Sequence, residues 1–230
     1  MGFAGTNLVI GHRGAAGLAP ENTLDGFRRA AALGVDAVEL DVHALDGAVV
    51  VIHDDALDRT TSGRGPLRAQ SLAALRRLDA GGGQRVPLLQ EVFAALPVNV
   101  GVNVELKGRG TAELAVPLAA AEMALGRDLL ISSFDLDELG RAAALGGAAL
   151  KIAPLFGRWP RQGWRVARAL RAWSVNLSLR TASRRLVEEA GERGLATLIY
   201  TVNDRPTADR LIDWGATGVF TDHPDLLISG

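Results

Sequence analysis

Short apolar segments alternate with longer amphipathic segments along almost the whole chain. The short segments are rich in Val, Ile and Leu and lack a regular polar face, which is typical of strands buried on both sides. Eight of them predict strands, at Asn7–Gly11, Ala37–Val42, Val100–Leu106, Asp128–Ser132, Leu150–Leu155, Ser174–Ser178, Thr197–Val202 and Gly218–Thr221.

The segments between these strands predict helices, and several of them end at a glycine, as helix C-termini often do. The helices are expected at Thr23–Leu33, Thr111–Leu125, Asp135–Leu145, Ser183–Arg193 and Pro206–Trp214. Eight strand–helix units in 230 residues favour an α/β fold of the (β/α)8 TIM barrel type. A doubly wound open sheet is the alternative.

One segment interrupts the alternation directly after the second strand. Val49–Ile52 reads as a ninth strand, and Leu45–Gly47 before it reads as a hairpin turn. Such a hairpin would return His53 to the end of the second strand, at the mouth of the barrel. Residues 54–87 then form a small insertion with one helix at Ser71–Leu78. We expect residues 1–230 to form a single domain.

Composition narrows the class of protein. The chain is 48% hydrophobic, so it can bury a large core, and its net charge of −1 argues against a nucleic-acid partner. The absence of cysteine excludes disulfides and thiolate metal sites. The N-terminus lacks the features of a signal peptide, and the apolar stretch 114–121 is too short to span a bilayer. We expect a cytoplasmic protein without stable membrane insertion.

Three carboxylates occupy strand ends. Glu39 and Asp41 are two residues apart on one strand, so both point to the same side, and Glu105 ends the next barrel strand in the same way. These could be ordinary solvated carboxylates. Together, however, they predict a site for one divalent cation, because like charges so close need compensation. Oxygen ligands favour Mg²⁺, Ca²⁺ or Mn²⁺ over zinc.

Two histidines also follow apolar strands. His12 and His53 could be hydrogen-bonded core residues, but their shared place at the barrel mouth favours a general base and a general acid. His43 and His223 are expected to be structural or peripheral.

Cations lie beside these strand ends. Arg13 and Lys107 are interpreted as phosphate contacts, with neutralising salt bridges as the alternative. Glu21 is expected in the metal or phosphate shell, and Asn22 or Thr23 could cap the first helix.

An ordered set of motifs through essentially the whole chain resembles the glycerophosphodiester phosphodiesterase family. The set comprises Gly11–Gly14, Pro20–Thr23, Glu39–Val42, Asp46–Gly47, His53–Asp54, Arg59–Gly65, Pro87–Val92, Asn103–Lys107, Ser132–Phe134, Tyr200–Asn203 and Thr221–Pro224.

The resemblance implies a (β/α)8 barrel that hydrolyses glycerophosphodiesters to glycerol 3-phosphate and an alcohol. By matching positions it also implies one divalent cation on Glu39, Asp41 and Glu105. The resemblance further implies that His12 and His53 are the acid–base pair and that Arg13 and Lys107 bind the phosphate. Glu21 is implied as an auxiliary residue of that shell.

Two positions depart from the family pattern. The turn before Asp46 is one residue shorter, and Tyr200 stands where many relatives have tryptophan. Phe156 and Tyr200 follow the fifth and seventh predicted strands, so we expect both to form an apolar wall facing the mouth. The alternative is that they are core aromatics.

Other functions stay open at this point. A phosphodiesterase acting on lysophospholipids ranks second, because no long basic amphipathic segment is visible. A catalytically silent phosphate-binding barrel would be expected to lose a histidine or a carboxylate. A zinc amidohydrolase is disfavoured, since the first strand has no His-x-His pair. The preferred alcohol, the metal, the histidine roles, the nucleophile and the oligomeric state are left undetermined.

Overall fold

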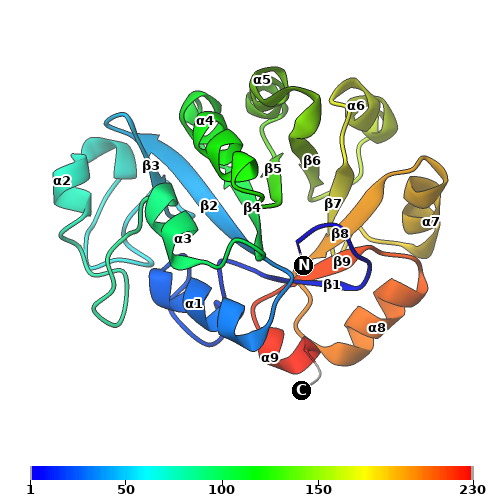
Figure 1. Cartoon of the computed structure of the whole chain (residues 1–230), viewed down its shortest axis with the longest axis horizontal. Coiled ribbons are helices and arrows are strands. Elements are labelled where there is room, and N and C mark those ends of the chain that lie inside the picture. Colours follow the sequence, from blue (N-terminus) through cyan, green and yellow to red (C-terminus); the bar gives the residue numbers. More distant parts are fainter. Residues whose placement is uncertain (1, 229–230) are drawn as a thin grey trace.

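The eight apolar segments pair as parallel strands that close into a barrel. The computed structural model describes residues 2–228. Closure is shown by β1, which pairs with both β2 and β9 and leaves no free edge in the barrel (Figure 1). The fold is therefore a (β/α)8 TIM barrel, and the open-sheet alternative is excluded. Its strands are β1 (Leu8–Gly11), β2 (Ala37–Leu45), β4 (Gly101–Leu106), β5 (Leu129–Ser133), β6 (Lys151–Phe156), β7 (Ser174–Ser178), β8 (Ala196–Tyr200) and β9 (Gly218–Thr221).

Helices surround the barrel and bury its outer face. The five expected helices are present as α1 (Leu24–Leu33), α4 (Thr111–Ala124), α5 (Leu136–Gly146), α7 (Arg184–Glu192) and α8 (Arg205–Asp213). Side chains of Thr23, Asp135, Ser183 and Asp204 accept hydrogen bonds from backbone N–H groups in the first turns of four of them. Additional short helices are α3 (Leu89–Ala95), α6 (Gly163–Ala169) and α9 (Pro224–Leu227), with 3₁₀ turns η1 (Leu67–Ala69) and η2 (Gly147–Ala149).

The expected hairpin is confirmed. β3 (Ala48–Val51) pairs antiparallel with β2, so that Val51 lies opposite Val42. Asp46 and Gly47 between the strands both have positive φ, at 49° and 76°, as a tight two-residue turn requires. The backbone N–H of Ile52 donates to the carbonyl of Asp41 over 2.9 Å. The chain leaves this ladder at His53, beside the C-terminal end of β2.

The insertion packs on the hairpin through its own small apolar cluster. Its buried residues are Leu57, Leu67, Leu75, Ala80 and Val86, together with Leu45, Val50 and Ile52 of the hairpin. The expected helix at Ser71–Leu78 is shorter than predicted and spans one turn, α2 (Leu72–Leu75). After this turn, Arg76 donates to the carbonyl of Val86 and pairs with Glu91, which joins the insertion to α3.

Alternation along the strands separates the outer core from the barrel interior. On β2, Val38, Leu40 and Val42 are fully buried in the cluster beneath the helices, so Glu39 and Asp41 point inward. Across residues 2–228, no helix is long and apolar enough to cross a membrane.

Candidate functional site

A tight loop after β1 brings two of the candidate residues to the mouth. A Cβ atom on Gly11 would lie 2.1 Å from the carbonyl oxygen of Gly14, so only glycine permits this close turn. The loop continues through Arg13, whose φ is +50° and whose N–H donates to Glu39 Oε2 over 2.9 Å. His12 and Arg13 are thereby fixed above the end of β2.

The three carboxylates meet as the sequence predicts. Asp41 on β2 is in register with Glu105 on β4, and ligand atoms of Glu39, Asp41 and Glu105 all lie within 4.8 Å of one another. Burial, followed by the charge of Asp41, raises the pKa of Glu39 to about 8. Burial and the same neighbour also raise the pKa of Glu105. Burial of carboxylates this close together disfavours their charged forms, and a bound cation would offset that cost.

The donor atoms of the cluster fit a hard divalent cation. Glu39 Oε1 and Asn103 Oδ1 are buried and have no hydrogen-bond partner in the structure. On the parallel strands β2 and β4, Glu39 and Asn103 are in register. An all-oxygen set with two unpartnered acceptors suits Mg²⁺, Mn²⁺ or Ca²⁺.

Both candidate histidines are oriented by a carboxylate on one ring nitrogen. His12 Nδ1 lies 2.7 Å from Asp222 Oδ1, and His53 Nδ1 lies 2.5 Å from Asp54 Oδ1. The Nε2 atom of His53 lies 3.2 Å from Lys107 Nζ. Burial lowers the pKa of His12, but the hydrogen bond to Asp222 and the charge of Glu39 outweigh it, so this pKa is raised.

The cations are paired with carboxylates. Arg13 Nη1 lies 2.7 Å from Glu21 Oε1, and its Nε lies 3.3 Å from Asp41 Oδ2. Lys107 Nζ lies 2.7 Å from Glu105 Oε1 and 3.5 Å from Asp41 Oδ1. The neutralising role considered for these cations is thus observed, and contact with phosphate stays a prediction.

The mouth holds a cavity of about 220 Å³ with a charged and an apolar wall. Tyr200 forms part of the apolar wall and packs edge-on against Phe134 and Phe220, with ring centroids 6.1 and 6.4 Å away. The cavity is lined by His12, Arg13, Glu39, His53, Asn103, Glu105, Lys107, Phe134, Leu155, Tyr200, Thr201 and Phe220.

The expectation that Phe156 faces the mouth is wrong. Its side chain is buried on the outer side of the barrel with Leu177 and Leu186, and its ring centroid lies 5.0 Å from that of Trp159. Successive strand residues point to opposite faces, so the preceding residue, Leu155, lines the cavity instead.

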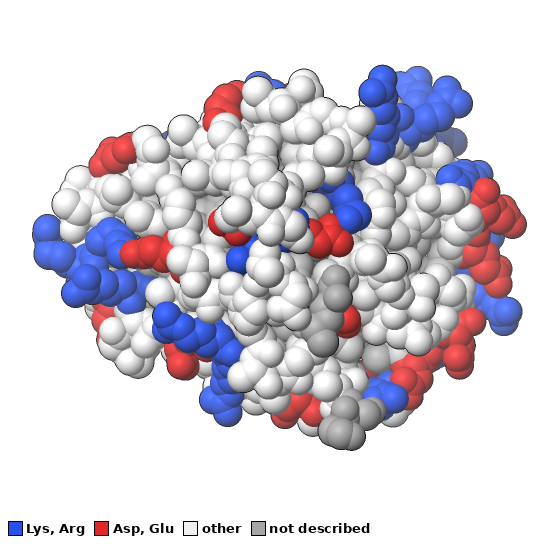
Figure 2. Space-filling view, in the orientation of Figure 1, with Lys and Arg blue, Asp and Glu red and all other residues white. Residues whose placement is uncertain are grey.

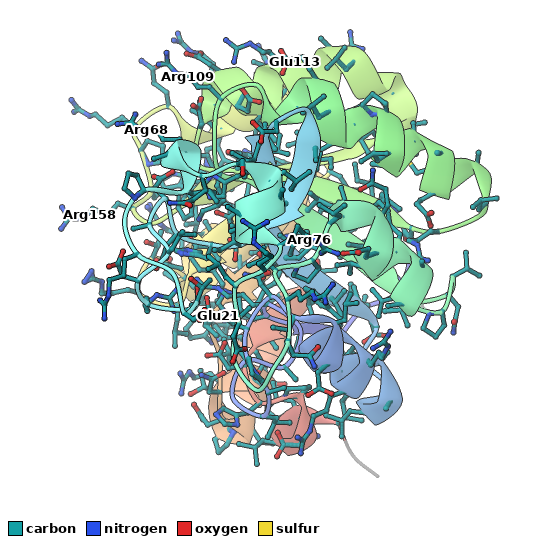
Figure 3. All side chains as sticks on the ribbon, turned by 90° about the vertical axis from the view of Figure 1, so that its left-hand side faces the viewer. Glu21, Arg68, Arg76, Arg109, Glu113 and Arg158 are labelled. Atoms are coloured by element: carbon teal, nitrogen blue, oxygen red, sulfur yellow. The ribbon has the colours of Figure 1, made fainter. Side chains whose placement is uncertain are left out.

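Several residues of the site escaped the sequence interpretation. Thr23, not Asn22, caps α1. The side-chain amide of Asn22 instead donates to Asp41 Oδ2 over 2.9 Å. Arg59 of the insertion bridges Glu21 and Asp54 with four hydrogen bonds. Figure 3 labels Glu21, which receives this contact from the insertion. Asn103 and Glu105 are two residues apart, as Glu39 and Asp41 are. This spacing was the one sequence signal that Asn103 also faces the barrel interior.

The two remaining histidines do not line the cavity. His43 is buried behind His53, with its Nε2 atom 3.2 Å from the His53 carbonyl oxygen. His223, in the loop after β9, lies against Gly17 of the loop after β1. Their expected peripheral placement agrees with these positions.

Comparisons with known proteins point to one family and one fold. Residues 12–226 match the model of the glycerophosphoryl diester phosphodiesterase family. A glycerophosphodiester phosphodiesterase of Caldanaerobacter subterraneus subsp. tengcongensis is 35% identical over 96% of each chain. A solved phosphodiesterase of Oleispira antarctica, in complex with the product sn-glycerol-3-phosphate, is 30% identical with a TM-score of 0.88, over 96% of this chain and 95% of that one. A Thermotoga maritima glycerophosphodiester phosphodiesterase structure is 28% identical with a TM-score of 0.78, over 96% and 97%.

Proposed function

Because the chain belongs to the glycerophosphoryl diester phosphodiesterase family, we propose that it hydrolyses glycerophosphodiesters to glycerol 3-phosphate and an alcohol. The observation that carries the proposal is the pair of histidines beside a carboxylate cluster in one cavity. Each histidine is held at Nδ1 by its own carboxylate, which leaves Nε2 available for proton transfer.

Glu39, Asp41 and Glu105 would hold one divalent cation, Mg²⁺, Ca²⁺ or Mn²⁺, with Asn103 Oδ1 as a further oxygen donor. The support is the mutual approach of the three carboxylates and the two unpartnered buried oxygens. When bound, such a cation supplies Lewis-acid stabilisation of the charge that grows on the phosphate oxygens.

His53 would act as the general base and His12 as the general acid. His53 is held at Nδ1 by Asp54, so its Nε2 atom, 3.2 Å from Lys107 Nζ, is the ring atom placed to take up the nucleophile's proton. His12 lies between Asp222 and Glu39, whose charges favour its protonated form. The nucleophile's proton, from water or from the glycerol 2-hydroxyl, passes to His53 Nε2. The departing alcohol oxygen receives its proton from His12 Nε2.

Arg13 and Lys107 would bind the phosphate from their present positions beside the cluster, and Glu21 would hold Arg13 in place. A 220 Å³ cavity has room for little more than the glycerol phosphate part. A second cavity of about 500 Å³ lies across Glu21 and Arg59, lined by hydroxyl side chains of the insertion. It supplies space for the alcohol, and the buried hydroxyl of Thr60 there has no hydrogen-bond partner among residues 2–228.

Release of glycerol 3-phosphate from a panel of glycerophosphodiesters, with lysophospholipids alongside, tests the proposal. His12→Ala and His53→Ala should each lower turnover about 100-fold or more. His223→Ala, at the same end of the barrel but outside the cavity, is the matched control and should retain activity. Wild-type turnover in His53→Ala would refute the acid–base assignment, and hydrolysis of lysophospholipids alone would favour the second candidate substrate class.

Metal removal is the companion test. Chelation should abolish turnover, and added Mg²⁺, Mn²⁺ or Ca²⁺ should restore it. Glu39→Gln should bind the cation more weakly in a direct titration, because a neutral amide replaces a charged ligand. Full turnover of the wild type in excess chelator would contradict the metal site while leaving the histidine assignment standing.

A further inference from the structure

The small net charge of the chain conceals a strong segregation of charge. Residues 139–187 contain ten of the 25 Lys and Arg but none of the 26 Asp and Glu. This stretch therefore carries +10 and the rest of the chain −11, which together give the net −1. It covers β6, α6 and β7 with their loops, on one flank of the barrel. A potential of one sign is expected over that flank.

Six of these ten cations have no carboxylate partner in the described part of the chain. Four are paired, namely Arg141 with Glu138, Lys151 with Asp128, Arg184 with Glu188 and Arg185 with Glu189. The other six are exposed, and none has a carboxylate within ion-pair distance among residues 2–228: Arg158, Arg161, Arg165, Arg168, Arg171 and Arg180. Figure 2 shows blue side chains gathered over α6, and in Figure 3 the labelled Arg158 projects away from the barrel.

An apolar groove runs within this basic flank. It encloses about 790 Å³ and is lined by Trp164, Ala167, Ala172 and Leu195, with Arg165, Arg168, Arg171 and Arg193 around it. The Arg193 guanidinium lies 4.5 Å from the centroid of the Trp164 ring, and the Trp164 N–H donates to Glu189. The groove thus offers hydrocarbon surface beside guanidinium groups, which matches an amphiphile with an anionic head.

We propose that this flank, defined by the six unpaired arginines and the groove, docks the protein on an anionic lipid surface. Arginines near such a surface gain electrostatic attraction, and the apolar groove can accept hydrocarbon from the interface. Trp164, which lines the groove, is partly exposed, and tryptophan favours the membrane–water interface. A nucleic acid would leave the apolar groove without a partner. The docking is peripheral and does not depend on the proposed hydrolysis.

Sedimentation with vesicles tests this docking. The protein should bind phosphatidylglycerol–phosphatidylcholine vesicles but not phosphatidylcholine vesicles, and 0.5 M NaCl should release it because salt screens exposed charges. The triple variant R165Q/R168Q/R171Q should bind on the order of 100-fold more weakly. The triple variant R28Q/R77Q/R85Q changes the net charge equally at exposed positions elsewhere and should bind as the wild type does.

The remaining measurements separate docking from catalysis and folding. Both triple variants should keep the wild-type melting temperature and the wild-type turnover of soluble substrate, since none of these arginines lines the catalytic cavity. Docking is overturned if the anionic vesicles do not bind, if neutral vesicles bind equally, or if R165Q/R168Q/R171Q binds like its control. Binding of a DNA duplex in place of vesicles would also overturn it and assign the flank to nucleic acid.

Discussion

Individual side chains decide how the two histidines are held, and Asp222 offers the sharpest test. Its Oδ1 atom faces His12 Nδ1, and its Oδ2 atom accepts a 2.9 Å hydrogen bond from Asn203 Nδ2. In Asp222→Asn, an NH₂ group replaces one carboxylate oxygen. Because NH₂ cannot accept a hydrogen bond, the contact with either His12 Nδ1 or Asn203 Nδ2 is lost. We expect turnover to fall about 10- to 100-fold with little change in melting temperature. Asn203→Ala is the control and should lose less; an unaltered rate in Asp222→Asn would remove the orienting role.

Phe156 and Tyr200 should respond in opposite ways to substitution. Phe156→Ala should lower the free energy of unfolding by about 3–5 kcal/mol and leave the ranking of substrates unchanged, because this ring fills the outer core. Tyr200→Trp should alter the ranking, since this ring lines the cavity. Denaturant unfolding and a substrate panel measure the two effects. A changed ranking in Phe156→Ala would contradict the outward placement.

Strand alternation made Glu39, Asp41 and Glu105 predictable, because two-residue spacing fixes the shared face. Phe156 was misplaced because its position at the end of a strand was taken to put it at the mouth, whereas alternation along the strand turns its side chain to the outer face. The partner of His12 is a different case. Asp222 is 210 residues from His12 along the chain, and only closure of the barrel brings the two together.

The insertion contacts α3 through an ion pair between Arg76 and Glu91. Glu91 accepts from Arg76 and from the N–H of Leu88. Burial raises the pKa of Glu91, but these hydrogen bonds outweigh it and hold the pKa below its usual 4.5. The stabilisation is therefore complete above pH 4.5 and is lost as the pH falls through the lowered value in the folded state.

Glu91→Gln should accordingly be less stable than the wild type at pH 7, by about 1 kcal/mol, because the pair is partly exposed. The difference should shrink as the pH is lowered from 5 towards 3. Urea unfolding of both proteins across this range measures it. A difference that grows on acidification would show that Glu91 does not carry this pH dependence.

Helices with side-chain caps and long amphipathic faces could be predicted from the sequence. α3 and α6 could not, since both span seven residues and neither begins with a capping Ser, Thr, Asp or Asn. The hairpin turn was predictable from Asp46-Gly47, and so was an insertion after it, whereas the internal fold of the insertion was not. Its fold depends on packing against Val50 and Ile52 rather than on local periodicity.

For the whole molecule, we predict that the barrel and the insertion unfold as one domain. The insertion's apolar cluster includes hairpin residues that continue from β2, and Arg59 joins it to Glu21 of the barrel mouth. All four tryptophans lie between residues 159 and 214, far along the chain from the insertion. Their fluorescence therefore reports on the opposite half of the barrel.

Leu75→Ala provides the test, because Leu75 is fully buried in the insertion and its truncation should cost about 2–5 kcal/mol. In a single cooperative unit, the urea midpoints from tryptophan fluorescence and far-UV circular dichroism should coincide and should both fall in this variant. Leu125→Ala, at a side chain that is 71% exposed, is the matched control and should shift neither midpoint. If Leu75→Ala left the fluorescence midpoint unchanged while a separate dichroism transition appeared, the insertion would unfold independently of the barrel.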